Sequence, residues 1–248
     1  MRYIPKMKIL ITGVSSGIGN ALAKKFLQEG HSVFGVARRE EILKSLEQTY
    51  PNFFFKSGDV GDRKFILELG KKLNNLNFVP DVIVLGAGVQ LDDALPKYNS
   101  ELSKKMFNTN VFGVLNFIDL FLEKFLDQKK GHFIVLSSIS AFKPHRESVT
   151  YPATKSAISM SFKGFNLHYK KRGVIFSNIY LGPIDTQMWK GKKSFLVTSP
   201  EKIAERIKKV IYSKKENYYL PFFSTTVSRM SKLIPSRLYS YLSEKLLK

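Results

Sequence analysis

The chain of 248 residues is long enough to bury a substantial core as one large domain, and the absence of cysteine excludes disulfides and thiol chemistry. With 40 Lys and Arg against 20 Asp and Glu, its formal net charge of +20 suits an anionic partner or else reflects only a solvated, lysine-rich surface. The longest apolar stretch, residues 111–126, contains Asp119, Glu123 and Lys124 and therefore cannot span a membrane. Because the N-terminus does not read as a signal peptide and the lack of cysteine fits a reducing interior, we expect a protein of the cytoplasm, either free or peripheral at the inner face of a membrane.

The first predicted unit is a strand over residues 8–11, a glycine-rich turn with the sequence TGVSSGIG, and a helix that ends near Gly30. Glycines let the backbone approach a pyrophosphate, whose charge is met by backbone N–H groups and by the helix N-terminus. A strand before the turn and a helix after it are what a dinucleotide-binding loop requires. The turn therefore predicts cofactor contacts from Thr12, Gly13, Ser15, Ser16, Gly17, Ile18 and Gly19.

A second predicted strand, residues 31–37, ends at Arg38 and Arg39. A protein that binds NAD usually places an acid at this point to hold the ribose 2′-hydroxyl, whereas an arginine suits the 2′-phosphate of NADP. The sequence therefore favours NADP(H) over NAD(H). This prediction depends mainly on Arg38, because Arg39 could equally be a solvated residue in the first turn of the next helix.

A third predicted strand ends shortly before Asp59. The Asp59 carboxylate either caps the helix predicted over residues 62–73 or faces the adenine of a bound nucleotide, and the spacing favours neither alternative. The fourth strand, residues 81–85, is a continuous apolar run of the kind buried on both faces of a sheet, and three small residues follow it. Small side chains let a ligand lie against the backbone, which predicts cofactor contacts at Ala87 and Gly88.

A long helical region is predicted over residues 100–129. Asn110 lies within it, although asparagine is disfavoured inside helices, so we expect a specific role to hold this residue there. Apolar side chains recur in the same region at helical spacing and are expected to pack against the sheet or against a subunit partner. They are Val111, Leu115, Ile118, Leu122 and Phe125.

The segment from Ser138 to Lys155 is the strongest candidate for chemistry. Ser138 follows the apolar run of residues 132–136, at the C-terminal end of a predicted strand, where parallel sheets place their ligands. Tyr151 and Lys155 lie four residues apart at the start of a predicted helix and therefore on one face of it. A lysine ammonium beside a tyrosine stabilises the phenolate and lowers a pKa that is ordinarily about 10. Tyr151 then acts as a general acid, with Ser138 as an assisting hydrogen-bond donor.

Residues 174–180 are predicted to form another strand, followed by the sequence LGPIDT, and residues 218–220 a last one. Between them lie residues 187–197, which form either a mobile flap or an ordinary surface loop, and a helix over residues 199–212. Strands that alternate with helices imply an α/β fold with a doubly wound parallel sheet, the Rossmann fold, in a single domain over residues 1–220.

These motifs resemble the short-chain dehydrogenase/reductase family over about residues 7–220. The glycine turn matches the family pattern TGxxxGxG, and the pattern YxxxK is present as Tyr151 and Lys155, with Ser138 thirteen residues before the tyrosine. The chain departs from the family at two places. The family's NNAG is LGAG here, and its PGxxxT is LGPIDT, with Leu181 in place of the proline.

The resemblance implies hydride transfer between a nicotinamide and the carbon of a carbonyl or alcohol substrate, with Tyr151 as the proton donor in reduction. It implies that Lys155 also holds the nicotinamide ribose, that Ser138 polarises the carbonyl, and that Asn110 positions a water molecule. It also implies a homodimer or homotetramer and no metal site. Besides Tyr151 and Lys155, the further cofactor contacts that it implies are Asp59, Val60, Gly182, Ile184 and Thr186.

Residues 221–248 extend past the resemblance as a basic, amphipathic C-terminal extension. Its apolar face can lie on an anionic membrane surface, fold back over the substrate pocket, or enter a dimer contact. The substrate pocket itself is expected to be fairly apolar and to be lined by Phe142, His145, Met188 and Trp189.

Two other functions come from different classes of protein. A cofactor-binding sensor or regulatory protein without turnover is the alternative, for which the LGAG change is the only hint, and the intact catalytic positions oppose it. The net charge of +20 suggests a nucleic-acid-binding protein as a third function. No aromatic and basic recognition motif accompanies this charge, so we expect no nucleic acid partner.

Overall fold

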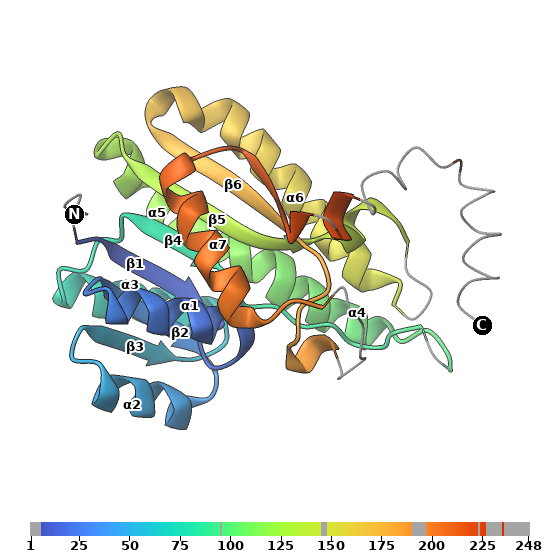
Figure 1. Ribbon diagram of the computed structural model, residues 1–248, viewed down its shortest axis with the longest axis horizontal. Helices are drawn as coiled ribbons and strands as arrows, with labels where there is room; N and C mark the ends of the chain where they lie inside the picture. Colours follow the sequence, from blue (N-terminus) through green and yellow to red (C-terminus); the bar gives the residue numbers. More distant parts are fainter. Residues whose placement is uncertain are drawn as a thin grey trace.

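The computed structural model contains a sheet of seven parallel strands in the order β3-β2-β1-β4-β5-β6-β7 (Figure 1). The structure describes residues 6–94, 96–144, 148–189, 197–222, 224–226 and 235. Within them every neighbouring pair of strands is parallel, which confirms the predicted doubly wound α/β fold. The strands are β1 (Lys8–Thr12), β2 (Ser32–Ala37), β3 (Phe53–Ser57), β4 (Val82–Leu85), β5 (Gly131–Ser138), β6 (Val174–Leu181) and β7 (Asn217–Leu220).

Helices cover both faces of this sheet, as the continuous apolar runs of the central strands predict. They are α1 (Gly17–Gln28), α2 (Glu40–Thr49), α3 (Arg63–Asn75), α4 (Ser100–Phe107), α5 (Gly113–Asp127), α6 (Thr150–Tyr169) and α7 (Pro200–Ser213). One core lies between the sheet and α1, α2 and α7, and a second core lies between the sheet and α3, α5 and α6 (Figure 1). Both faces of the sheet are therefore covered by helices, so a ligand can reach the sheet only at the ends of its strands.

Strand β5 lies near the centre of this packing and is buried over its whole length. Its side chains alternate between the two cores, so that it contributes apolar residues to each. Phe133 lies between Phe125 of α5 and Phe176 of β6, with ring centroids 4.9 Å apart in both pairs. These contacts fix the strand whose C-terminal end carries Ser138.

The helical region predicted over residues 100–129 consists of α4, a π-helical turn at Asn108–Phe112, and α5. Asn110 is buried within the π-helical turn, a conformation often found at functional sites. The predicted apolar stripe packs against the sheet. Ile118 and Phe125 are buried in the second core, and Leu115 and Leu122 are partly buried against it, whereas Val111 is buried outside both cores.

The direction of the chain across the sheet changes between β1 and β4, which are neighbours although two strands separate them in sequence. The chain leaves β1 for α1 on one face and leaves β4 for α4 and α5 on the other. In sheets of this type, ligands bind at the carboxyl edge of the strands, at the point where the strand order reverses. This edge lies at the arrowheads of the strands in Figure 1.

Most of the predicted amphipathic extension, residues 221–248, lies outside the described residues, as do His145 and residues 190–196. The membrane, pocket and dimer alternatives for the extension therefore stay predictions. No helix in the described part of the chain has the length and the apolar character needed to cross a membrane.

Candidate active site

The glycine turn between β1 and α1 has the backbone that a phosphate-binding loop needs. Gly13 and Gly17 have φ angles of +81° and +54°, in the left-handed region that favours glycine. Gly13 N donates a hydrogen bond to Val36 O at 2.8 Å, which ties the turn to β2. A Cβ atom on Gly19 would lie 2.3 Å from Gly13 O, so the helix can start this close to the turn only with glycine at this position.

The N-terminus of α1 is suited to an anion. Its N-cap residue, Ser16, makes no capping hydrogen bond with its side chain, and none of the described residues in the first turn is acidic. Thr186, from the segment after β6, lies against the turn: a Cβ atom added to Gly17 would be 3.1 Å from Thr186 Cγ2. Backbone N–H groups and the positive end of the helix dipole attract negative charge, so these residues fit the pyrophosphate of a dinucleotide.

Arg39 faces the glycine turn, whereas Arg38 is largely exposed. The Arg39 guanidinium donates to Ser15 Oγ at 3.0 and 3.2 Å and to Ser15 O at 2.9 Å. The Arg38 side chain is 67% exposed, and its guanidinium lies 4.0 Å from the Asp59 carboxylate. Arg39 is therefore not a freely solvated residue, as one alternative predicted, and both cations lie at the end of β2.

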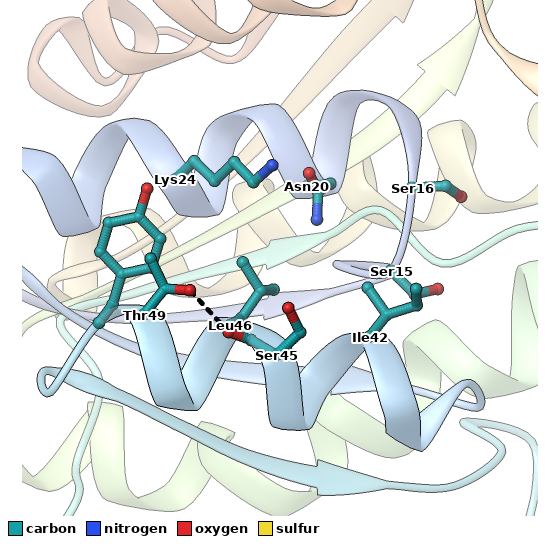
Figure 2. Close-up of a pocket in the computed structure, with 9 residues that line it drawn as sticks. Ser15, Ser16, Asn20, Lys24, Ile42, Ser45, Leu46 and Thr49 are labelled. Carbon is teal, nitrogen blue, oxygen red and sulfur yellow. Dashed lines mark hydrogen bonds between the residues drawn. The ribbon is translucent and has the colours of Figure 1, made fainter.

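A pocket of about 430 Å³ opens beside the glycine turn, between α1 and α2 (Figure 2). Ser15 and Ser16 lie at one end of it. Much of its lining is polar and comes from both helices: Asn20, Lys24, Ser45 and Thr49. The predicted catalytic residues do not line this pocket, so it is not the place of a reacting carbonyl.

Asp59 does not cap a helix. Its Oδ1 atom accepts a hydrogen bond from Gly61 N at 2.8 Å. The N-cap of α3 is Asp62, whose Oδ1 atom accepts from Lys64 N at 2.8 Å. The capping alternative for Asp59 is therefore wrong, and the adenine contact stays a prediction, together with that of the buried Val60.

The LGAG segment at the end of β4 is held by Thr12. Thr12 Oγ1 accepts hydrogen bonds from Gly86 N and from Ala87 N, both at 3.0 Å. A Cβ on Gly86 would lie 2.9 Å from Thr12 O and 3.0 Å from Leu136 Cδ1, so Leu136 fills the space that a side chain here would need. Leu85 is buried in the core. The departure from the family pattern therefore leaves this segment anchored.

Asn110 joins the loop after β4 to α6. Its Oδ1 atom accepts from Val89 N at 2.8 Å, and its Nδ2 atom donates to Val89 O at 2.9 Å and to Thr154 Oγ1 at 3.1 Å. A Cβ on Gly88 would lie 3.3 Å from Asn110 Oδ1 and 3.6 Å from Lys155 Nζ. Gly88 therefore packs closely against Asn110 and Lys155, and a side chain at this position would crowd both of them.

Ser138, Tyr151 and Lys155 meet at the carboxyl edge of the sheet, and all three are buried. Helix α6 begins at Thr150, so Tyr151 lies in its first turn. Lys155 Nζ lies 5.6 Å from the centroid of the Tyr151 ring and donates a hydrogen bond to Leu136 O at 2.8 Å. The structure thus brings together the three residues that the sequence predicts to be catalytic, with Asn110 bound to the same helix.

The pKa values in this cluster are set mainly by burial. Burial raises the pKa of Tyr151 to about 12, although a hydrogen bond with Ser138 acts in the opposite direction. Burial also lowers the pKa of Lys155 to about 8. The expected lowering of the tyrosine pKa by the lysine is therefore wrong for the free protein, because desolvation of the phenolate dominates. At neutral pH the tyrosine is protonated and most of the lysine is charged.

The predicted pocket residues are only partly brought to the tyrosine. Tyr151 Oη donates to Met188 Sδ at 3.8 Å, so Met188 contacts the hydroxyl directly. Phe142 packs instead against Tyr180 and Tyr219 of β6 and β7, with ring centroids 4.7 and 6.3 Å apart. Met188 therefore marks the side from which a substrate would approach.

The segment after β6 contributes mainly through Thr186. Gly182 N donates to Leu220 O at 2.9 Å, and the Ile184 side chain is buried in the core beneath α7, so only the Ile184 backbone is available to a cofactor. Thr186 lies against the glycine turn, as its predicted cofactor contact requires. Among the described residues, no group of three His, Asp or Glu side chains could hold a metal ion.

Comparisons with known proteins find relatives of this chain. A family model described as short chain dehydrogenase matches residues 7–196. An uncharacterized oxidoreductase of Staphylococcus epidermidis is 32% identical over 192 residues, which cover 77% of this chain and 84% of that protein.

Two solved structures share the fold. The closed form of serine dehydrogenase complexed with NADP+ has a TM-score of 0.80 at 23% identity, over 86% of this chain and 94% of that one. A 4-hydroxyisoleucine dehydrogenase complexed with NADH has a TM-score of 0.79 at 19% identity, over 86% and 96% of the two chains.

Gly19→Ala is expected to weaken NADPH binding by about tenfold or more, which corresponds to about 1.4 kcal/mol. The added Cβ would lie 2.3 Å from Gly13 O and would separate the turn from α1. Fluorescence titration with NADPH measures the effect. Gly164→Ala is the matched control, because a Cβ there has nothing within 4 Å. Equal affinity of the two variants would show that the turn does not hold the cofactor.

Lys155→Met is expected to change how stability depends on pH. The folded protein releases the Lys155 proton near pH 8, whereas the unfolded chain holds it to about the ordinary pKa of 10.5. The buried charge therefore disfavours folding below pH 8, and this cost is relieved as the pH rises to 10.5. Relative to the variant, the free energy of unfolding of the original protein should rise by about 3 kcal/mol over this range. Urea unfolding of both proteins at a series of pH values measures it, and a constant difference would contradict the buried charge.

Proposed function

The chain belongs to the short-chain dehydrogenase/reductase family of oxidoreductases, and on this basis we propose that it reduces a small carbonyl compound with NADPH, or oxidises the corresponding alcohol with NADP+. The observation that carries the proposal is the meeting of Ser138, Tyr151 and Lys155 beside a glycine turn that fits a dinucleotide. A bound NADPH supplies the hydride.

In reduction, Tyr151 donates its proton to the oxygen of the forming alcohol, and Ser138 donates a hydrogen bond to the same oxygen. The pKa of about 12 keeps Tyr151 protonated in the free protein, as a donor must be. Lys155, with a pKa near 8, carries a positive charge at neutral pH and stabilises the phenolate that Tyr151 leaves behind. Asn110 keeps the first turns of α6 against the loop after β4, and in this proposal it also positions a water molecule for Lys155.

The preference for NADP(H) is supported by the two arginines at the end of β2. A 2′-phosphate there would meet the guanidinium of Arg39 and the hydroxyl of Ser15, which already lie within 3.2 Å of each other, with Arg38 beside them. Arginine binds phosphate through charge-assisted, often bidentate hydrogen bonds. The serine dehydrogenase of the same fold is complexed with NADP+, whereas the 4-hydroxyisoleucine dehydrogenase is complexed with NADH, so the arginines carry this part of the proposal.

The described part of the chain gives no support to the alternative of a sensor or regulatory protein without turnover. The LGAG segment that suggested it is anchored by Thr12 and packed against Leu136. We also propose that the enzyme is a homodimer or homotetramer, as the family resemblance implies. The basic, amphipathic sequence of residues 221–248 suits an anionic membrane surface, a fold back over the substrate pocket or a dimer contact, and these three alternatives stay predictions.

Tyr151→Phe is expected to lower kcat by about 10²- to 10⁴-fold, because it removes the proton donor, and to leave NADPH affinity unchanged. A panel of aldehydes and ketones that includes the activated aldehyde 4-nitrobenzaldehyde, with NADPH consumption as the readout, measures turnover. Tyr212→Phe on α7, where the tyrosine is exposed, is the matched control. Retained turnover would remove Tyr151 as the donor. NADPH binding by the original protein without turnover of any carbonyl would favour the sensor instead.

Arg38→Ala and Arg39→Ala are each expected to weaken NADPH binding by about tenfold or more, and NADH binding much less, because only NADPH carries the 2′-phosphate. Calorimetric titration of both cofactors measures the two affinities. Arg63→Ala on α3, where the arginine is exposed and paired with Asp119, is the control. An equal loss of NADPH and NADH affinity would reject the phosphate contact.

A further inference from the structure

A buried carboxylate lies at the first turn of α6. Asp93, in the loop after β4, has no exposed surface (0%). Its Oδ1 atom accepts hydrogen bonds from Ser148 Oγ and Val149 N, each at 3.0 Å. Its Oδ2 atom accepts from Thr150 N and Ser103 Oγ, each at 3.1 Å. Three of these four donors belong to the start of α6, and the fourth belongs to α4.

Asp93 takes the place of a local helix cap. The N-cap residue of α6 is Val149, whose side chain makes no capping hydrogen bond, and the first N–H groups of a helix need acceptors. A carboxylate at this end is also favoured by the helix dipole. Although burial by itself raises the pKa of Asp93, hydrogen bonds from Thr150, Ser148, Val149 and Ser103 hold it below its ordinary value. The group is therefore a charged cap at neutral pH.

The same cluster reaches the backbone of Tyr151. Ser148 Oγ, which donates to Asp93, accepts a hydrogen bond from Tyr151 N at 3.3 Å. Thr150 Oγ1 donates to Ser103 Oγ at 2.7 Å, which links the first turn of α6 to α4. Lys155, one turn further on, is fixed separately by Leu136 O, so the cluster acts mainly on the tyrosine.

We propose that Asp93 is a positioning residue for Tyr151: by fixing the first turn of α6, it sets the place of the phenol hydroxyl relative to Ser138 and the substrate oxygen. The inference rests on the proposed function, because it takes Tyr151 to be the proton donor. The hydrogen bonds of the Asp93 side chain go to Ser103, Ser148, Val149 and Thr150, and none of them goes to Tyr151 or Ser138. A displacement of a reacting group by about 1 Å can cost about 100-fold in rate, so loss of the cap should be visible in turnover.

Asp93→Asn tests the proposal because it keeps the size of the side chain and turns one acceptor oxygen into an N–H₂ group that faces N–H and O–H donors. With NADPH and 4-nitrobenzaldehyde, kcat should fall by about 10- to 100-fold, while NADPH affinity stays within about twofold of the original. Hydrogen exchange at the amides of residues 149–151 should accelerate. Asp119→Asn, at an exposed position on α5, is the matched control and should change none of these quantities.

A double-mutant cycle with Tyr151→Phe separates positioning from a general loss of structure. If Asp93 acts through the tyrosine hydroxyl, Asp93→Asn should not lower further the residual single-turnover rate of Tyr151→Phe. An equal fractional loss in both backgrounds, or unchanged kcat and exchange in Asp93→Asn alone, would overturn the proposal and leave the proposed function standing. Full activity of Tyr151→Phe would instead overturn the proposed function. If Asp93→Asn does not fold, Ser148→Ala serves for the same cycle, because it removes the hydroxyl between Asp93 and the Tyr151 amide.

Discussion

The hydrogen bond from Lys155 Nζ to Leu136 O is the contact on which the site depends most, because it fixes α6 against the end of β5. A buried ammonium group is costly unless it is hydrogen-bonded, so helix and strand have one favourable register. In that register Tyr151, one helical turn before the lysine, lies beside Ser138, which follows Leu136 by two residues on the strand. This contact sets the register of α6 on β5, and the hydrogen bonds of Asp93 then fix the first turn of α6, which carries Tyr151.

The parallel sheet brings the remaining groups to the same place. Each functional segment leaves the C-terminal end of a strand, and the carboxyl ends of parallel strands share one edge. The glycine turn and Thr186 are far apart in the sequence but touch, because the segments after β1 and β6 converge over this edge. Within the sheet the side chains pack in the two cores, as Phe133 does between Phe125 and Phe176. The candidate catalytic side chains lie instead at the carboxyl edge.

The sequence was sufficient for features that depend on local patterns. Continuous apolar runs locate the buried strands, the glycine pattern between a strand and a helix locates the turn, and four-residue spacing places Tyr151 and Lys155 on one helix face. Features that depend on contacts distant in sequence could not be predicted. The orientation of Arg39 toward Ser15 is decided by how β2 lies beside the turn. The capping role of Asp93 is decided by donors 10 to 57 residues away. The tyrosine pKa follows from burial, which spacing does not reveal.

A crystal structure of the complex with NADP+ tests the central claim most directly, because it needs no knowledge of the substrate. We expect the pyrophosphate at the N-terminus of α1, the 2′-phosphate against Arg38 and Arg39, and the nicotinamide beside the Tyr151 hydroxyl, with Lys155 on its ribose. A dinucleotide bound with its nicotinamide away from Tyr151, or bound outside the carboxyl edge of the sheet, would contradict the proposed chemistry.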